Sequence, residues 1–587
     1  MTTRLTSAPN VNHLWAGLLV EELVRQGVGL FVVCPGSRST PLAVAVAENP
    51  GAESLVHWDE RAAAFVALGW GRATGRPAAV ITTSGTAVAN LLPAAVQADA
   101  DGVPLLLLTA DRPPELRETG ANQTVRQPPV FRDVARWTLD WPVPTTDVPA
   151  RWVLSTAAHA VHRARQPAGP VHLNLPFREP LAATPDGTDA AATLADVGRW
   201  AEGAAPFVRA GALDRHPDHV DADEADPDLI DRLARAERGL VVAGALADGR
   251  PAVRLARALG WPLFPDLRSS LRLGAPEGAV PFFDLALASG QLGAVGPDAV
   301  VHLGGRLLSK RLGRYLAAAR PATYVRVGAE PGRADPDGLV TDRLAAPVAD
   351  GAAALEGAGG GGSAAWRSRW AAASAAAAEV AEGATGEAGI ARAVSRGVPE
   401  GGALVVAASM PVRDLEAYAV AGGAAARVVA NRGASGIDGT VATAAGVARG
   451  TGRPVVLLTG DLALLHDQTS LALLRTGPPV VVVAVNNDGG GIFHRLPVAH
   501  GSGALAPGTF ERMFGTPHGL GFADAARQFG LAYHAPDTLP AFEEALDAAR
   551  RSGTSALIEV RTERHEQAEV RRQLEAAAAA AVDAALA

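Results

Sequence analysis

The stretch Val455-Val456-Leu457-Leu458-Thr459-Gly460-Asp461-Leu462 is followed at a distance by Val480-Val481-Val482-Val483-Ala484-Val485-Asn486-Asn487-Asp488-Gly489. Each apolar run has the length of a buried strand, and residues 464–475 between them have the length and composition of one helix. A strand–helix–strand unit places its two strands in parallel. The sequence therefore predicts that Asp461 and Asn487 lie together at the carboxyl edge of a parallel sheet, where α/β proteins bind ligands.

These two strand ends carry the oxygen ligands that Mg²⁺ prefers. Asp461 offers a carboxylate, Asn487 an amide oxygen and Gly489 an unobstructed backbone carbonyl. Each dipeptide by itself is more commonly an ordinary strand-end turn. The pair, 26 residues apart with a strand before each member, favours a metal site. Because Mg²⁺ usually keeps substrate phosphates in its shell, a bound di- or triphosphate is expected.

The composition indicates a large globular protein. The 587 residues suggest three or four domains, and 48% hydrophobic residues provide for several cores. The net charge of −8 gives no support to nucleic-acid binding. A single cysteine, Cys34, excludes an internal disulfide and a multi-cysteine metal site. No signal pattern or membrane-length apolar run is present, so we expect a cytoplasmic protein without a membrane partner.

Alternating strand and helix patterns indicate an α/β fold with three parallel-sheet domains. The middle region lacks an intact G-x-G-x-x-G after a strand, so a dinucleotide there is unsupported. The predicted boundaries are a first α/β domain at 1–182, a linker at 183–227, a central α/β domain at 228–350, a glycine-rich linker at 351–363 and a third α/β domain at 364–587.

The first domain contains two candidate ligand segments. Residues 34–41 follow a short strand and combine glycine, hydroxyls and Arg38; the alternative is a plain strand-to-helix turn with a capping hydroxyl. Glu60 stands at the start of an alanine-rich helix, where a carboxylate is commonly only a cap.

The Gly-Asp and Asn-Asn spacing resembles the motif of thiamine diphosphate-dependent enzymes. The motif usually has glycine as its third residue, and this chain has Leu462. Leu462 is shared with one branch of that family, the menaquinone-pathway carboligases, which the whole chain resembles. The resemblance rests on segments 35–42, 59–61, 83–90, 109–116, 120–123, 431–439 and 460–462.

The resemblance implies three thiamine diphosphate-fold domains, which are a pyrimidine domain, a central domain and a diphosphate domain. It also implies thiamine diphosphate and Mg²⁺, or Mn²⁺, as cofactors. Glu60 would be the catalytic carboxylate that hydrogen-bonds to N1′ of the aminopyrimidine, and Ile437 would support the bent cofactor. Metal ligands would be Asp461, Asn487 and Gly489. The implied cofactor-binding residues are Glu60, Ser409, Arg432, Ser435, Gly436, Ile437, Gly460, Asp461, Leu462 and Asn487.

By the same resemblance, 2-oxoglutarate is decarboxylated and the resulting succinyl carbanion adds in 1,4 fashion to isochorismate. Both substrates are dicarboxylates, and arginine suits bidentate carboxylate recognition. Taken singly, each basic residue is more commonly a solvated surface charge. The residues implied to face isochorismate are Ser37, Arg38, Arg112, Gln123 and Lys310. Those implied for the distal carboxylate of the other substrate are Arg311 and Arg413, with Ile492, Phe493 and Leu496 as an apolar wall or as plain core packing.

The family places its cofactor between the first domain of one chain and the third domain of another, which implies a homodimer or homotetramer. The nearest alternative is another thiamine diphosphate carboligase or 2-oxoacid decarboxylase, such as an acetolactate synthase. A more distant alternative is a non-catalytic member of the fold. No histidine is expected to act as acid or base, and His57, His466 and His494 are expected to be structural.

Overall fold

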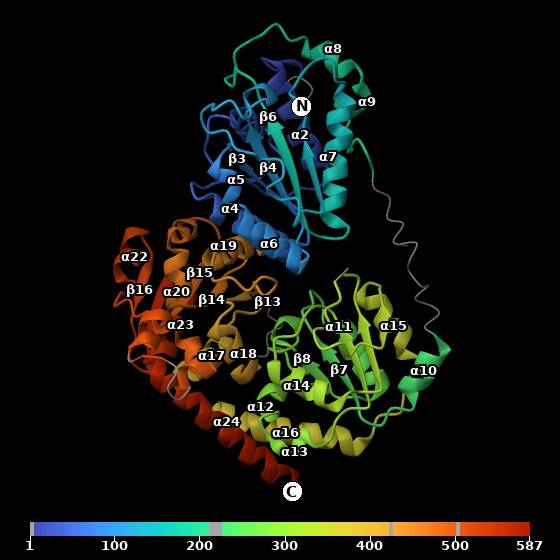
Figure 1. Cartoon of the computed structure of the whole chain (residues 1–587), viewed down its shortest axis with the longest axis vertical. Coiled ribbons are helices and arrows are strands. Elements are labelled where there is room, and N and C mark those ends of the chain that lie inside the picture. The colour runs from blue at the N-terminus through green and yellow to red at the C-terminus, as the bar shows by residue number, and fades with distance from the viewer. Residues whose placement is uncertain (1–4, 210–225, 331, 422–426, 501–504, 507) are drawn as a thin grey trace. The chain divides into compact units, whose positions relative to one another are not determined.

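The computed structural model describes residues 5–209, 226–330, 332–421, 427–500, 505–506 and 508–587. It contains three sheets, and every paired strand within them runs parallel to its neighbour (Figure 1). This confirms the predicted α/β class. The strands read as continuous apolar runs because helices cover both faces of a parallel sheet.

The first sheet has the strand order β2-β1-β3-β4-β6-β5. Its long central strands are fully buried, as their sequences require. The strands are β1 (Phe31–Val33), β2 (Ser54–Val56), β3 (Ala78–Thr82), β4 (Leu105–Asp111), β5 (Trp137–Asp140) and β6 (Pro170–Pro176). The helices of this region are α2 (Val11–Arg25), α3 (Thr40–Ala47), α4 (Glu60–Thr74), α5 (Thr86–Ala89), α6 (Leu92–Asp101), η1 (Pro114–Leu116), α7 (Ala150–Arg165), α8 (Ala190–Ala195) and α9 (Gly198–Glu202).

The second sheet has five strands in the order β11-β10-β9-β7-β8. They are β7 (Gly239–Ala243), β8 (Leu263–Pro265), β9 (Ala299–Leu303), β10 (Thr323–Val327) and β11 (Asp342–Leu344). Its helices are α10 (Pro227–Ala234), α11 (Arg250–Leu259), η2 (Leu267–Ser269), α12 (Phe283–Ala286), α13 (Gly290–Gly293), α14 (Lys310–Ala319) and α15 (Val348–Glu356).

The third sheet has the order β13-β12-β14-β15-β17-β16. Its strands are β12 (Ala403–Val406), β13 (Arg427–Ala430), β14 (Val455–Gly460), β15 (Val480–Asn486), β16 (Ala532–His534) and β17 (Ala556–Arg561). The helices of this part of the sequence are α16 (Ala364–Glu382), α17 (Gly386–Arg396), α18 (Met410–Tyr418), α19 (Thr440–Thr451), α20 (Asp461–His466), η3 (Gln468–Arg475), η4 (Gly491–Arg495), α21 (Pro497–His500), η5 (Glu511–Gly515), α22 (Ala523–Gln528), α23 (Leu539–Arg551) and α24 (Arg564–Leu586).

The segment between β14 and β15 differs from the prediction of one helix over 464–475. Helix α20 already begins at Asp461 and ends at His466, and a 3₁₀ segment, η3, completes the connection. The carboxylate of Asp467 explains the break, because it accepts hydrogen bonds from the N–H groups of Val441 and Ala442 at 2.7 and 3.0 Å. The end of α20 is thus set by a distant helix start that local composition does not reveal.

The chain divides into two compact units. One contains Met1–Ala212, Asn431–Gly452 and Asp467–Gly477, and the other contains Leu213–Ala430, Arg453–His466 and Pro478–Ala587. Helix α19 therefore belongs to the same unit as the first sheet, where it packs along α4. Among the helices that the structure describes, none is long and apolar enough to cross a membrane.

Small residues allow α4 and α19 to approach closely. A Cβ added to Gly69 would lie 2.3 Å from the backbone oxygen of Thr443, and one added to Gly446 would lie 2.1 Å from that of Val66. Backbone oxygens cannot move away as a flexible side-chain end can. The helix contact therefore requires glycine at both positions.

We expect Gly69→Ala to destabilise this unit by about 1–3 kcal/mol, because overpacking outweighs the gain in helix propensity. The measurement is the denaturant unfolding midpoint. Gly313→Ala in α14 is the matched control, since its Cβ would meet only a carboxylate oxygen of Asp337 at 3.9 Å. The control should be neutral or slightly stabilising. Equal midpoints for the two variants would show that the α4–α19 contact adapts.

Candidate functional site

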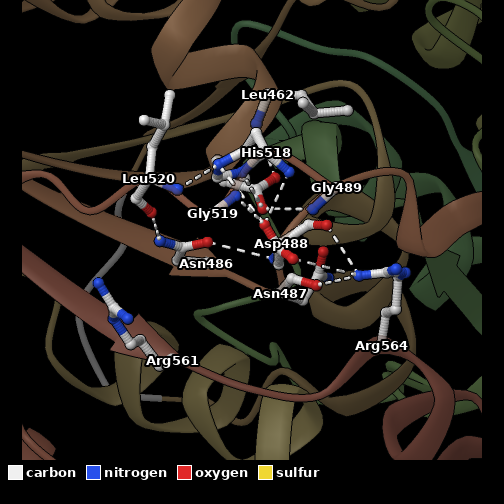
Figure 2. A network of polar contacts seen from close by, with 12 residues as sticks. Leu462, Asn486, Asn487, Asp488, Gly489, His518, Gly519, Leu520, Arg561 and Arg564 are labelled. Atoms are coloured by element: carbon white, nitrogen blue, oxygen red, sulfur yellow. Dashed lines mark hydrogen bonds and ion pairs between the residues drawn. The ribbon is translucent and has the colours of Figure 1, made fainter. Parts of the chain in front are cut away.

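The ends of β14 and β15 form the centre of the candidate site. The two strands are direct neighbours, with Gly460 opposite Val485 in the register. Asp461 follows β14 immediately and Asn487 follows β15 immediately, so both emerge at the same carboxyl edge. The N–H of Gly489 donates a hydrogen bond of 2.8 Å to Oδ2 of Asp461, which joins the two strand ends (Figure 2). The predicted juxtaposition is thus present.

Asp461 is a buried carboxylate surrounded by donors. Oδ1 accepts the N–H of Leu462 at 2.6 Å, and Oδ2 also lies 3.2 Å from Nε2 of His518. The N–H of Leu520 donates to Nδ1 of His518 at 3.0 Å (Figure 2). The imidazole proton is therefore on Nε2, which faces Asp461. Burial raises the pKa of Asp461, and the hydrogen bond from Gly489 opposes that shift. A cation beside this carboxylate would favour its charged form.

Asn487 presents an oxygen that the described protein atoms do not satisfy. Its Nδ2 donates to Oε1 of Glu387 at 2.9 Å, which fixes the direction of the amide. Its Oδ1 is buried and has no hydrogen-bond partner within the part of the chain that the structure describes. Buried polar atoms are rarely left without a partner. This oxygen therefore fits a ligand position for a bound cation.

A buried charge network holds Glu387. Arg571 forms ion pairs with both Glu387 and Asp414, and its hydrogen bonds to the two oxygens of Asp414 measure 2.7 and 2.6 Å. The hydroxyl of Thr562 donates to Oε1 of Glu387 at 2.8 Å. The amide of Asn487 is thus oriented by a carboxylate that is itself fixed by an arginine.

Backbone conformation completes the turn after β15. Asp488 has φ +59° and Gly489 has φ +132°, and a Cβ at Gly489 would lie 2.0 Å from the carbonyl oxygen of Gly515. Arg564 donates through Nη1 to the carbonyl oxygens of Asn487 at 3.2 Å and Asp488 at 2.8 Å (Figure 2). Only glycine satisfies both the torsion angle and the close approach at position 489.

Asp461, Asn487 and Gly489 therefore fit a hard divalent cation. They offer one carboxylate, one unsatisfied amide oxygen and one backbone carbonyl oxygen. Such a set of oxygen ligands suits Mg²⁺, which does not require sulfur or imidazole ligands. Gly460 ends β14, and Leu462 donates its N–H to Asp461, so both motif neighbours shape the same turn.

If Asp461, Asn487 and Gly489 hold Mg²⁺, Glu387→Gln should weaken its binding about 10- to 100-fold, the usual cost of losing a group that orients a ligand. The neutral amide holds Asn487 and Arg571 less firmly. The measurement is the Mg²⁺ concentration that half-saturates the site. Glu382→Gln is the matched control, because among the described residues Glu382 forms its ion pairs with Arg392 and Arg396, near the surface. An unchanged Mg²⁺ requirement in Glu387→Gln would contradict the orienting role.

Glu60 lies in the unit that contains the first sheet, at the first position of α4. The capping role belongs to its neighbour Asp59, whose side chain accepts the N–H of Ala62 at 3.1 Å. Among the described residues, no hydrogen bond or ion pair to the Glu60 carboxylate is found. Burial, followed by the charge of Glu60, raises the pKa of the Cys34 thiol at the end of β1. Glu60 is thus available for a ligand.

In the unit that contains the first sheet, basic and amide side chains lie close together near the ends of strands. Arg112 and Gln123 both hydrogen-bond to Ser84, the latter through the Ser84 carbonyl at 2.7 Å. Arg38 is buried and donates to the carbonyl of Phe177 at 2.9 Å, while Ser37 beside it is exposed. Burial and the nearby Arg38 both lower the pKa of Arg112. Arg38 already pairs with Glu179 at 3.2 Å, so Arg112, which has no carboxylate ion pair in the described ranges, is the cation better placed for an anionic ligand.

The other unit holds the remaining predicted basic residues. Lys310 is exposed at the start of α14, and Arg311 beside it pairs with Asp284 at 2.9 Å and Glu575 at 2.6 Å. Arg413 donates to the carbonyl of Ser409 at 2.6 Å and has no carboxylate partner in the described ranges.

Burial lowers the pKa of Arg413, as does the nearby Arg495. Arg413 is therefore better placed than Arg311 to bind an added carboxylate, because Arg311 already has two carboxylate partners.

The predicted apolar wall and the predicted cofactor loop lie in different units of the chain. Ile492 and Phe493 lie half-buried on η4, and Phe493 packs edge-on against Phe514 with ring centroids 5.7 Å apart. Leu496 is exposed. The loop before α19 belongs to the first unit, where the N–H of Ala434 donates to Gln97 at 3.0 Å. That loop carries Arg432, Ser435, Gly436 and Ile437, and Ser435 has φ +64°.

Sequence reasoning did not identify His518, Glu387 or Arg564. Each lies far along the chain from the motif it contacts, and none stands in a recognisable pattern. Only Thr516-Pro517-His518-Gly519, a turn-forming segment, offered a weak signal for His518.

Three segments of the chain match known protein families. Residues 15–130 match the family "Thiamine pyrophosphate enzyme, N-terminal TPP binding domain", residues 191–406 match the "Middle domain of thiamine pyrophosphate", and residues 418–560 match the "C-terminal TPP binding domain". Thiamine pyrophosphate is another name for thiamine diphosphate. These matches confirm the three domains that the resemblance implied.

Several curated proteins are similar over nearly their whole length. One from Rubrobacter xylanophilus is 54% identical, covering 96% of this chain and 98% of the relative. One from Salinibacter ruber is 49% identical, covering 98% of each, and one from Chlorobaculum tepidum is 41% identical, covering 97% and 98%. All three are named 2-succinyl-5-enolpyruvyl-6-hydroxy-3-cyclohexene-1-carboxylate synthase. The chain belongs to the thiamine pyrophosphate enzymes and, within them, to the family of 2-succinyl-5-enolpyruvyl-6-hydroxy-3-cyclohexene-1-carboxylate synthases.

Proposed function

We propose that the protein is a transferase of menaquinone biosynthesis. It decarboxylates 2-oxoglutarate and adds the remaining succinyl unit to isochorismate, with release of CO₂ and formation of 2-succinyl-5-enolpyruvyl-6-hydroxy-3-cyclohexene-1-carboxylate. Relatives with this name cover nearly the full chain. The structural observation that carries the proposal is the unsatisfied, buried Oδ1 of Asn487 next to Asp461, where a metal–diphosphate group fits.

Asp461, Asn487 and Gly489 would hold Mg²⁺ or Mn²⁺, and the metal would hold the cofactor diphosphate. Ser409, Arg432, Ser435, Gly436 and Ile437 would contact the cofactor. Thiamine diphosphate, when bound, supplies the carbon nucleophile that adds to a 2-oxoacid and accepts the electron pair released with CO₂. The task left to the protein is to hold both substrates and control proton positions.

Glu60 would hold the aminopyrimidine ring in the tautomer needed for catalysis. Its carboxylate has no partner among the described residues, because Asp59 caps α4 instead. A carboxylate in this state can accept a hydrogen bond from a ring nitrogen without breaking an existing contact.

The substrate carboxylates would bind at the arginine groups. Arg38 and Arg112, with Ser37, Gln123 and Lys310, would recognise isochorismate, and the lowered pKa of Arg112 supports an anion there, since an anion would offset the repulsion from Arg38. Arg413 would take the distal carboxylate of 2-oxoglutarate, with Arg311 in support. Ile492 and Phe493 would exclude water beside the reacting carbon.

The cofactor would bind between two copies of the chain, so that Glu60 acts together with Asp461 of the partner subunit. This requires a homodimer, or a homotetramer built from such dimers. The apolar side chains Val56 and Trp58, which are 63% and 64% exposed beside Glu60, support a covered surface at this position.

The test is an assay with thiamine diphosphate, Mg²⁺, isochorismate and 2-oxoglutarate that follows CO₂ release and isochorismate loss together. We expect equal amounts of both, and little CO₂ when pyruvate replaces 2-oxoglutarate. A clear preference for pyruvate would favour an acetolactate synthase-like activity. Absence of turnover with either acid, in protein that binds the cofactor, would favour a non-catalytic member of the fold.

A further inference from the structure

A second group of metal-binding side chains lies outside the oxygen site. His494 comes from η4, Glu511 begins η5, and His565 is the second residue of α24. Oε1 of Glu511 lies 3.2 Å from Nε2 of His565 and 4.0 Å from Nε2 of His494. One ligand atom from each of the three residues falls within 4.8 Å of the others. Within the described ranges, this is the one such trio of histidine, cysteine and acidic residues.

The charge arrangement prepares Glu511 as a ligand. Arg564 forms an ion pair with Oε2 of Glu511, and this contact leaves Oε1 directed at the two imidazoles. The hydrogen bond from Arg564 lowers the pKa of Glu511, and the two histidines add to that shift. A carboxylate held on one oxygen by a charged partner is the arrangement that orients ligands in established metal sites.

The two imidazoles differ in exposure. His494 is buried and packs against the ring of Phe510 with centroids 4.8 Å apart. The side chain of His565 is 64% exposed, so it can rotate to close the group. Zinc bonds of about 2.0–2.2 Å place neighbouring ligands of a tetrahedral site roughly 3.3–3.6 Å apart. The separations of 3.2 and 4.0 Å therefore need only small adjustments.

We propose that His494, Glu511 and His565 form a binding site for Zn²⁺ or a similar divalent transition metal, with water in the fourth position. Two imidazoles and one carboxylate favour such ions, whereas the all-oxygen set at Asp461 favours Mg²⁺. The two sites would therefore select different metals.

Bound metal would fix the segment that follows the Asn487 turn. Arg564 contacts Glu511 through Nη2 and the carbonyls of Asn487 and Asp488 through Nη1. The N–H of Gly490 also donates to the carbonyl of Gly515 at 2.7 Å. A metal that joins η4, η5 and α24 would thus stabilise the backbone that presents Asn487 and Gly489.

The test uses the full chain saturated with Mg²⁺ and thiamine diphosphate, and Co²⁺ as a coloured substitute for Zn²⁺. Titration should show one Co²⁺ equivalent with visible d–d absorption, displaced by Zn²⁺ and accompanied by a higher thermal unfolding midpoint. Loss of a residue that only orients a metal ligand typically weakens metal affinity about 10- to 100-fold. His565→Ala removes a ligand itself, so Co²⁺ affinity should fall by more than this. Because His565 is exposed, the variant is expected to fold normally.

His534→Ala, which removes a histidine from β16, is the matched control and should bind Co²⁺ as the unmodified chain does. Saturating Mg²⁺ and thiamine diphosphate keep the Mg²⁺ site occupied in all three proteins, so the difference in Co²⁺ binding reports the group of His494, Glu511 and His565. Equal Co²⁺ stoichiometry and affinity in His565→Ala and the unmodified chain would overturn the proposal, as would the absence of bound Co²⁺ in both. Neither result bears on the proposed synthase activity.

Discussion

Glu60→Gln should lower kcat about 10²- to 10⁴-fold, the range expected when a positioned acid–base group is lost. Glutamine retains the size of the side chain but cannot serve as the anionic hydrogen-bond acceptor that controls the cofactor ring. The fold should be unaffected, because Asp59 rather than Glu60 caps α4. The measurement is steady-state turnover alongside thiamine diphosphate binding by equilibrium dialysis. Turnover should fall much more than affinity.

Glu48→Gln provides a matched control, since Glu48 is an exposed residue at the end of α3. It should leave both quantities unchanged. Undiminished turnover in Glu60→Gln would reject the role proposed for this carboxylate.

Mixing two inactive variants tests whether the site is shared between subunits. If Glu60 acts with Asp461 of the partner subunit, chains of Glu60→Gln and Asp461→Asn that exchange freely should regain about a quarter of the sites, by the symmetry of a two-fold dimer. Each mixed dimer then holds one site with both native residues. If Glu60 and Asp461 of the same chain act together, no site is restored. Activity after refolding or prolonged mixing is the measurement.

The sequence predicted the parts of the fold in which local pattern and tertiary structure agree. The runs before Asp461 and Asn487 are buried central strands, and their neighbour relation follows from the short crossover between them. The sequence predicted that Gly489 offers an unobstructed backbone carbonyl. The structure adds two reasons for glycine here, which are its positive φ and the close approach of the Gly515 carbonyl oxygen.

Features set by distant contacts were not predictable. The short strands β2 and β11 are only partly buried and carry no alternating or apolar pattern. Glu387 and Asn487 are 100 residues apart, so their hydrogen bond leaves no mark on local sequence. His494 was expected to be structural, and its approach to Glu511 and His565 depends on how three separate segments pack, which no local pattern shows. Local sequence propensity does not predict such long-range contacts, because they depend on how distant segments pack in the folded domain.

Asp461→Asn should raise the Mg²⁺ concentration needed for thiamine diphosphate binding by at least about 10- to 100-fold, with loss of turnover at moderate Mg²⁺. The substitution keeps the shape of the side chain and removes its negative charge. Affinity for a hard cation depends strongly on the number of charged ligands. The measurement is cofactor binding by equilibrium dialysis across a Mg²⁺ series, which does not depend on catalysis.

Asp488→Asn is the discriminating control because it changes the same kind of side chain one residue after Asn487. The Asp488 carboxylate accepts the N–H groups of His518 and Gly519 at 2.8 and 2.6 Å, so its role is to close the turn. The amide oxygen that Asp488→Asn introduces can still accept these bonds, and the Mg²⁺ requirement should stay close to that of the unmodified chain. If Asp488→Asn raised the Mg²⁺ requirement as much as Asp461→Asn did, both carboxylates would have to be regarded as contributing to cation binding. The selective loss in Asp461→Asn would instead place the cation at the strand end beside the unsatisfied oxygen of Asn487.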